Sequence, residues 1–91
     1  MWKVIEHRTK ATKVIDKAPK QVQRKYSYWK QLIEKDDPYA VRKLKGFNDH
    51  ALKGNWEGYR SSYLNDQYRV LYIIKEKEVV VIVDQIGPHD Y

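Results

Sequence analysis

The chain has 91 residues and carries 18 Lys or Arg against 12 Asp or Glu, which gives a formal net charge of +6 at pH 7. A chain of this length builds one hydrophobic core, so we expect a single domain over residues 1–91. It contains no cysteine, which excludes disulfides, thiol nucleophiles and cysteine-based zinc sites and is typical of a reducing compartment. Because it also lacks a long apolar run or the pattern of a signal peptide, we expect a cytoplasmic protein.

The positive charge is concentrated in the first half of the chain. Residues 1–46 contain 13 Lys or Arg and 5 Asp or Glu, whereas residues 47–91 contain 5 and 7. Such an excess attracts polyanions such as RNA or DNA, because each neutralised phosphate releases counterions. A solvated lysine-rich surface explains the same charge. Charge alone therefore does not identify a partner.

The first half predicts one strand and two helices. Residues 2–6 alternate as a short strand does. Helical spacing follows and predicts a short amphipathic helix with Thr9 as its N-cap. Pro19 ends this helix and opens a second one, and we expect the pair to pack as a hairpin with its basic face in water. The two apolar stripes consist of Ala11, Val14, Ile15 and Ala18, and of Val22, Tyr26, Trp29, Leu32 and Ile33.

The second half predicts a loop and three strands. Pro38 ends the second helix, and residues 39–43 add one turn. Residues 45–58 hold three of the four glycines and follow neither period, so we expect a loop, and loops of this length are usually functional. Strands are predicted at residues 59–64, 67–74 and 78–86 as an antiparallel meander. The fold class is therefore α+β, with a short first strand and a helical hairpin on one face of a twisted, mostly antiparallel sheet whose other face is open.

Three motifs resemble a known family. They are D-H-A-L-K-G-N-W-E-G-Y-R at residues 49–60, Y-R-V-L-Y at residues 68–72 and I-G-P-H-D-Y at residues 86–91. They are similar to the RelE/ParE superfamily of bacterial type II toxins, and the YafQ and HigB branches look nearest. The resemblance implies a RelE-like α+β toxin that cleaves mRNA on the ribosome as an mRNA interferase. It also implies a cognate antitoxin encoded beside it.

The chain contains the histidine and arginine residues that metal-free RNA cleavage requires. The 2′-hydroxyl beside each phosphate is the nucleophile, so the enzyme needs a base, cations for the phosphorane and an acid for the leaving 5′-oxygen. Histidine titrates near neutral pH, and arginine matches phosphate oxygens. The candidates are His50, Arg60, Arg69 and His89. We expect no cofactor, and the three histidines lack the spacing of metal ligands.

The resemblance assigns roles to some of these positions. His50 and His89 match the active-site histidines of YafQ-like toxins, and Tyr91 matches their final aromatic residue. Arg69 matches the arginine that RelE uses in its strand motif. We expect Arg60 to help Arg69 hold the scissile phosphate. The expected contacts to the RNA backbone are Lys20, Arg24 and Lys53.

Several alternatives stay open. Where YafQ has an acidic residue, a histidine and a second acidic residue, this chain has Ser61, Tyr63 and Gln67. His50 can be merely exposed, and Arg69 can form an ion pair across its strand. The ParE branch inhibits DNA gyrase without nuclease groups. A catalytically silent RNA- or protein-binding module is the third possibility.

Overall fold

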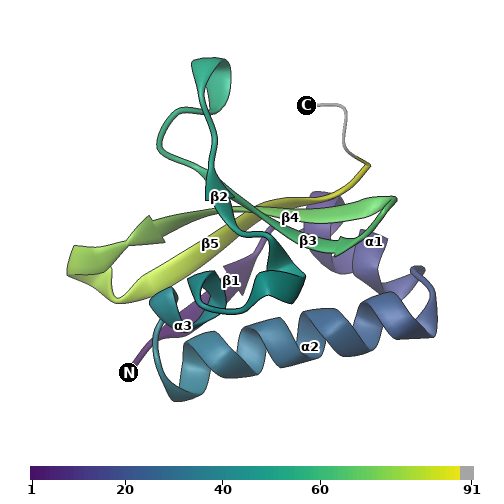
Figure 1. Ribbon diagram of the computed structural model, residues 1–91, viewed down its shortest axis with the longest axis horizontal. Helices are drawn as coiled ribbons and strands as arrows, with labels where there is room; N and C mark the ends of the chain where they lie inside the picture. Colours follow the sequence, from purple (N-terminus) through teal and green to yellow (C-terminus); the bar gives the residue numbers. More distant parts are fainter. Residues whose placement is uncertain (89–91) are drawn as a thin grey trace.

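The computed structural model describes residues 1–88, which form a five-stranded sheet with helices along one face (Figure 1). The strands are β1 (Lys3–Glu6), β2 (His50–Ala51), β3 (Arg60–Asn65), β4 (Tyr68–Lys75) and β5 (Val80–Gly87), and the helices are α1 (Lys13–Asp16), α2 (Lys20–Lys35) and α3 (Tyr39–Arg42). A π-helical turn, η1 (Arg8–Thr12), precedes α1, and short 3-10 turns are η2 (Lys45–Phe47), η3 (Gly54–Trp56) and η4 (Glu76–Glu78). In residues 1–88, no helix is long and apolar enough to cross a membrane.

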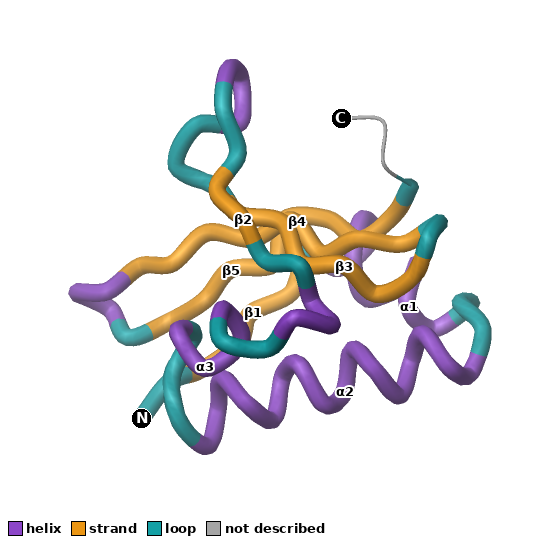
Figure 2. The backbone as a smooth tube through the Cα atoms, viewed as in Figure 1, coloured by secondary structure: helices purple, strands orange, loops and turns teal. Residues whose placement is uncertain are grey.

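The sheet has the order β1-β5-β4-β3-β2. The strands β3, β4 and β5 form the predicted antiparallel meander, and β1 is added parallel to β5 (Figure 2). The predicted α+β class is therefore confirmed. Because β1 ends where Glu6 lies opposite Val83, the second half of β5 is flanked by η1 instead of by a strand. The amide of His7 marks this change by donating to the carbonyl of Val83 at 2.9 Å.

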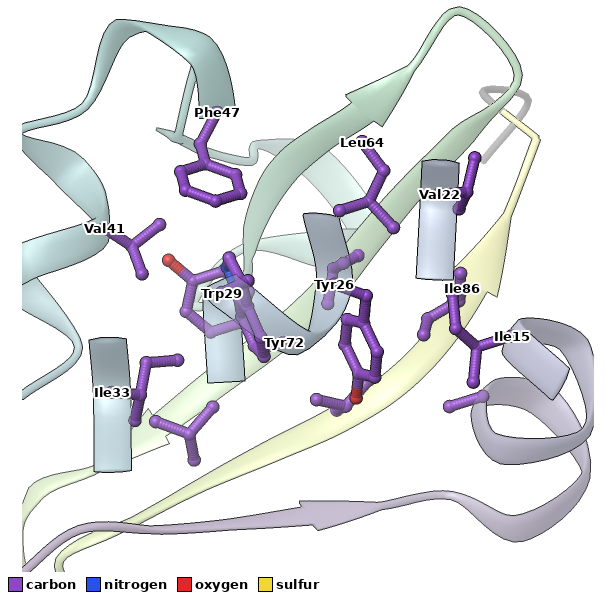
Figure 3. Packing of buried hydrophobic residues seen from close by; sticks show 14 of the residues in the cluster. Ile15, Val22, Tyr26, Trp29, Ile33, Val41, Phe47, Leu64, Tyr72 and Ile86 are labelled. Atoms are coloured by element: carbon purple, nitrogen blue, oxygen red, sulfur yellow. The ribbon is translucent and has the colours of Figure 1, made fainter. Parts of the chain in front are cut away.

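The core lies between α2 and the sheet. Burial follows the predicted stripe of α2, since Val22, Tyr26, Trp29 and Ile33 are all at most 3% exposed. Figure 3 shows Trp29 and Tyr72 side by side, with their rings in edge contact at 5.1 Å between centroids. An amphipathic helix of this kind gains most of its stability from such tertiary packing.

The start of the first helical segment differs from the prediction. Thr9 is not the N-cap, because it already lies inside the π-helical turn. His7 takes this place, with an extended backbone and a ring Nδ1 that accepts the amide of Lys10 at 3.1 Å. The hydrogen bond of His7 to β5 holds that residue in an extended conformation, so the helical segment can begin directly after it.

The segment 45–58 is not a loop throughout. It contains β2, in which His50 lies opposite Ser61 and Ala51 lies opposite Arg60. Two residues are too few for a strand periodicity to be recognised. Beyond β2 the chain rises on the side of the sheet away from α2 and returns through η3 (Figure 1). Gly54 and Gly58 have φ values of 68° and 95°, which residues with a side chain rarely adopt.

Candidate functional site

The register of β3 and β4 assigns polar side chains to two opposite faces of the sheet. Arg60 lies opposite Tyr72, and Tyr63 lies opposite Arg69. Opposed residues share a face, and residues an odd number apart along a regular strand lie on different faces. Tyr72 packs in the core beneath α2, so Arg60 is on the helix-covered face. Arg69 is on the open face, and the two predicted phosphate ligands are therefore separated by the sheet.

A buried carboxylate organises the helix-covered face. The side chain of Asp49 is fully buried and accepts from Arg60 Nε at 2.6 Å, from Ser62 Oγ at 2.5 Å and from the Tyr72 hydroxyl. Ser62 Oγ also accepts from Trp29 Nε1 at 2.9 Å. A buried carboxylate is stable only when donors satisfy its oxygens. The network thus fixes the start of β2 to β3, β4 and α2.

The electrostatics keep these groups in one protonation state. Burial, and then the nearby charge of Asp49, raises the pKa of Tyr72 above its ordinary value of 10.0, so its phenol remains a donor at neutral pH. Burial alone would lower the pKa of Arg60, but the hydrogen bond and charge of Asp49 raise it overall. Arg60 is therefore a cation held by Asp49, and its Nε is not available to a ligand.

His50 projects onto the open face because it lies opposite Ser61, whose side chain is on that face. Its side chain is exposed, and its Nδ1 lies 2.8 Å from the carbonyl oxygen of Asn48. A carbonyl only accepts, so Nδ1 is the donor and the neutral ring has a free lone pair on Nε2. Asn48 adopts a left-handed conformation, with φ at 41°, which asparagine tolerates. This arrangement suits a proton acceptor.

Arg69 is a partly buried cation on the open face. Its guanidinium lies 5.1 Å from the centre of the Tyr63 ring, and its Nε is buried without a hydrogen-bond partner in residues 1–88. No described carboxylate forms an ion pair with it, so the alternative pairing across the strand is absent from this part of the chain. A buried donor without a partner is costly unless a ligand satisfies it.

The open face brings some of the predicted residues together and leaves others apart. His50 and Arg69 are separated by two strand spacings and a two-residue offset, about 12 Å between Cα atoms. Lys53 is exposed in the segment that rises on the same side. Lys20 and Arg24 are exposed on α2, which lies on the other side of the sheet (Figure 1). His89 and Tyr91 lie outside the described residues, two and four positions after Gly87, which is opposite Arg69.

The three positions that differ from the YafQ motif, Ser61, Tyr63 and Gln67, lie in three different environments. Ser61 is buried on the open face between β2 and β4. The Tyr63 hydroxyl donates to Asp66 Oδ1 at 2.7 Å, which raises the pKa of Tyr63, and Lys25 Nζ lies 4.8 Å from the centre of its ring. Gln67 is exposed in the turn before β4. Among residues 1–88, no group of three His, Asp or Glu side chains is placed to hold a metal ion.

Solved structures share this architecture. No family model and no curated protein matches the sequence. The RelE–RelB complex of Pyrococcus horikoshii matches with a TM-score of 0.74 and 24% identity, covering 96% of this chain and 93% of that one. YafQ of E. coli gives 0.74 and 16%, with 98% and 94% covered. The YoeB–YefM complex of Staphylococcus aureus gives 0.73 and 15%, with 99% of both covered. The chain therefore has the fold of the RelE-like toxins, as its motifs predicted.

Proposed function

We propose that this protein is the toxin of a type II toxin–antitoxin pair and that it cleaves mRNA on the ribosome. The observation that carries the proposal is the open face of the sheet. There, an exposed histidine and an arginine lie on the same side of a RelE-like fold, and neither His50 Nε2 nor Arg69 Nε has a hydrogen-bond partner in residues 1–88. Attack by a 2′-hydroxyl on the adjacent phosphate first requires these two groups, a base and a phosphate-binding cation.

The proposed reaction uses four side chains and no metal. His50 Nε2 takes the proton of the 2′-hydroxyl, and the 2′-oxygen attacks the adjacent phosphorus. Arg69 stabilises the charge of the phosphorane, while His89 protonates the 5′-oxygen as its bond to phosphorus breaks. The products are a 2′,3′-cyclic phosphate and a 5′-hydroxyl. We assign Tyr91 to stacking on a base, which is worth about 1–3 kcal/mol in single-strand binders.

Arg60 is assigned a different role from that of Arg69. Since its Nε donates to Asp49 behind the sheet, we propose that Arg60 acts on the phosphate only indirectly, by holding the strand pair that carries His50. Lys53, on the side of the open face, is proposed to contact the mRNA backbone. Lys20 and Arg24, on the opposite side, are proposed to contact ribosomal RNA, because one RNA strand does not reach both faces at once.

A protein antitoxin is the second proposed partner. RelE of Pyrococcus horikoshii and YoeB of Staphylococcus aureus were solved with RelB and YefM, and YafQ of E. coli was solved with DinJ. We propose that a comparable protein, encoded beside this chain, neutralises it in the cytoplasm. Co-expression with the neighbouring reading frame should restore growth and yield a co-purifying complex.

The cleavage reaction is tested with purified protein, translating ribosomes and a defined mRNA. We expect cuts in the wild-type message that yield a 2′,3′-cyclic phosphate. A message with one 2′-deoxy sugar at the cut site should survive at that position, because the nucleophile is missing. Cleavage of the deoxy site would contradict the mechanism. Gyrase-linked DNA breaks without RNA cleavage would favour the ParE alternative. If the protein causes neither DNA breaks nor RNA cleavage, a binding module is favoured.

A further inference from the structure

An extra residue in β5 changes which side chains reach the open face. Adjacent positions of β4 pair with Gln85 and Val83, so Asp84 is a bulge between them. Without the bulge, strict alternation from the buried Val83 would direct Gln85 into the core and Ile86 outwards. Instead, Ile86 is 3% exposed in the core and Gln85 lies on the open face. Bulges often re-aim a side chain beside an active site.

The redirected glutamine borders a cavity of about 440 Å³ between η1, α1 and the ends of β4 and β5. Leu71 lies opposite Gln85 at the base of the cavity and is 1% exposed, so it offers a ligand almost no surface. The partly exposed Val14 contributes the accessible apolar surface, and Thr9 and Lys10 add polar groups from η1. The cavity thus combines apolar area with an amide and a cation, which suits a flat heteroaromatic ring attached to a phosphate backbone.

Within the described part of the chain, the amide of Gln85 is left for a ligand. Its side chain is half-buried and makes no hydrogen bond with any residue from 1 to 88. A glutamine amide offers one acceptor and two donors, which is the pairing that proteins use on the edges of nucleobases. In the helix-covered network around Asp49, by contrast, both carboxylate oxygens accept hydrogen bonds within the protein.

The cavity also lies next to the proposed cleavage site. Leu71 and Arg69 are two residues apart on one face of β4, about 7 Å along the strand. Gly87, which borders the cavity, lies directly opposite Arg69. A nucleotide whose phosphate is held by Arg69 therefore has its neighbouring base within reach of Gln85.

We propose that this cavity binds one unpaired RNA base beside the scissile phosphate and that Gln85 reads the edge of this base. The proposal rests on the proposed RNA cleavage and adds to it the residue that sets base preference. Val14 packs against the face of the base, and Lys10 contacts the adjoining phosphate. Single-stranded RNA is recognised in this way, by packing against base faces and by hydrogen bonds to base edges.

The test compares cleavage sites of the wild type and of Gln85→Met, which keeps the volume of the side chain and removes the amide. Mapping of 5′ ends over a message of mixed sequence should show a base preference next to the wild-type cut. In Gln85→Met, this preference should fall by roughly tenfold, the scale of one lost bidentate base contact. Gln31→Met, an exposed glutamine on α2, is the matched control and should keep the wild-type pattern.

Two further results separate the failure of this proposal from the failure of the proposed function. If the wild type and Gln85→Met cut with the same base preference while Arg69→Ala abolishes cutting, the base-reading role is wrong and the nuclease stands. If the wild type does not cut RNA at all, the proposed function is wrong. Fluorescence titration with short single-stranded RNA then decides: weaker binding by Gln85→Met, but not by Gln31→Met, supports the cavity, and equal binding overturns it.

Discussion

Asp49 and His50 are neighbours in the sequence and have opposite environments. The side chain of Asp49 is fully buried on the helix-covered face and receives three hydrogen bonds. His50 is exposed on the open face, and among residues 1–88 its ring bonds only to a backbone carbonyl. Arg60 and Arg69 differ in the same way, since one Nε donates to Asp49 and the other has no partner in residues 1–88. The groups around Asp49 are thus paired with one another inside the fold, whereas His50 is exposed and Arg69 Nε has no partner in residues 1–88.

The largest expected effect is on the free energy of unfolding and comes from Asp49→Asn, which disrupts the hydrogen-bond network on the helix-covered face. The substitution keeps the shape of the side chain, removes its charge and turns an amide group towards one of three donors. Removing one partner of a buried ion pair typically costs 3–5 kcal/mol, and we expect about 3 kcal/mol because Arg60 is 19% exposed. Urea unfolding measures this loss. Asp36→Asn, at the exposed end of α2, is the control and should change stability by less than about 0.5 kcal/mol.

A double-mutant cycle sharpens this prediction. If Asp49 and Arg60 act as a unit, Arg60→Gln should cost much less in the Asp49→Asn background than alone, with a coupling of about 1–3 kcal/mol. Additive losses would show that the pair is not coupled. In that case the stability of this face would come from the packing of Trp29 and Tyr72, which are both fully buried, and not from the hydrogen-bond network.

The second largest effect is on activity and concerns the open face. Arg69→Ala should lower the rate of RNA cleavage by about 10²–10³, as does loss of one transition-state donor in other enzymes. Its stability should change little, because the only described interaction of the guanidinium is with the Tyr63 ring, worth about 0.5–1 kcal/mol. Single-turnover kinetics and thermal unfolding measure the two quantities.

Arg42→Ala is the matched control for this variant. Arg42 also packs on a tyrosine, with its guanidinium 4.4 Å from the centre of the Tyr39 ring, but it lies on α3 on the helix-covered side. It should lose a similar small stability and keep full activity. Equal loss of activity in both variants would mean that cleavage depends on overall positive charge and not on the open face.

The sequence predicts the elements of the fold well because their periods are strong. The stripe of α2 and the strands β4 and β5 follow directly from the spacing of apolar residues. Motif resemblance also pointed to His50 and Arg69. The face that a residue occupies is harder to predict, because it depends on strand pairing. Arg60 was expected beside Arg69, and only the register of β3 against β4 places it behind the sheet.

Asp49 and Gln85 show what a sequence pattern does not contain. The donors to Asp49 come from two strands, β3 and β4, and lie 11 to 23 residues away in the chain, so their convergence depends on tertiary packing. Gln85 was not singled out, because the apolar run at residues 79–83 does not alternate and the bulge at Asp84 leaves no periodic signal of its own. Local signals therefore found the strands, and the pairing between strands determined the site.

The smallest expected effect concerns Glu6, a second carboxylate on the helix-covered side, and is measured as a dependence of stability on pH. Glu6 accepts from the Tyr26 hydroxyl at 2.5 Å and from Thr12 Oγ1 at 2.9 Å, and Lys30 Nζ lies 3.2 Å away. Burial opposes the charge of Glu6, but these hydrogen bonds and the lysine lower its pKa below the ordinary value of 4.5. A lowered pKa stabilises the fold above the unfolded value, and this stabilisation is lost as the pH falls through the folded value.

Glu6→Gln should therefore destabilise the protein by about 1 kcal/mol at pH 7, a figure reduced by the solvent around the partly exposed Lys30. The difference from the wild type should shrink as the pH falls below 4.5, because the wild-type carboxylate is then protonated as well. Urea unfolding between pH 3 and pH 7 gives this curve, and Glu57→Gln, at an exposed position, should give a flat one. A loss that is independent of pH would mean that Glu6 stabilises β1 through shape and not through charge.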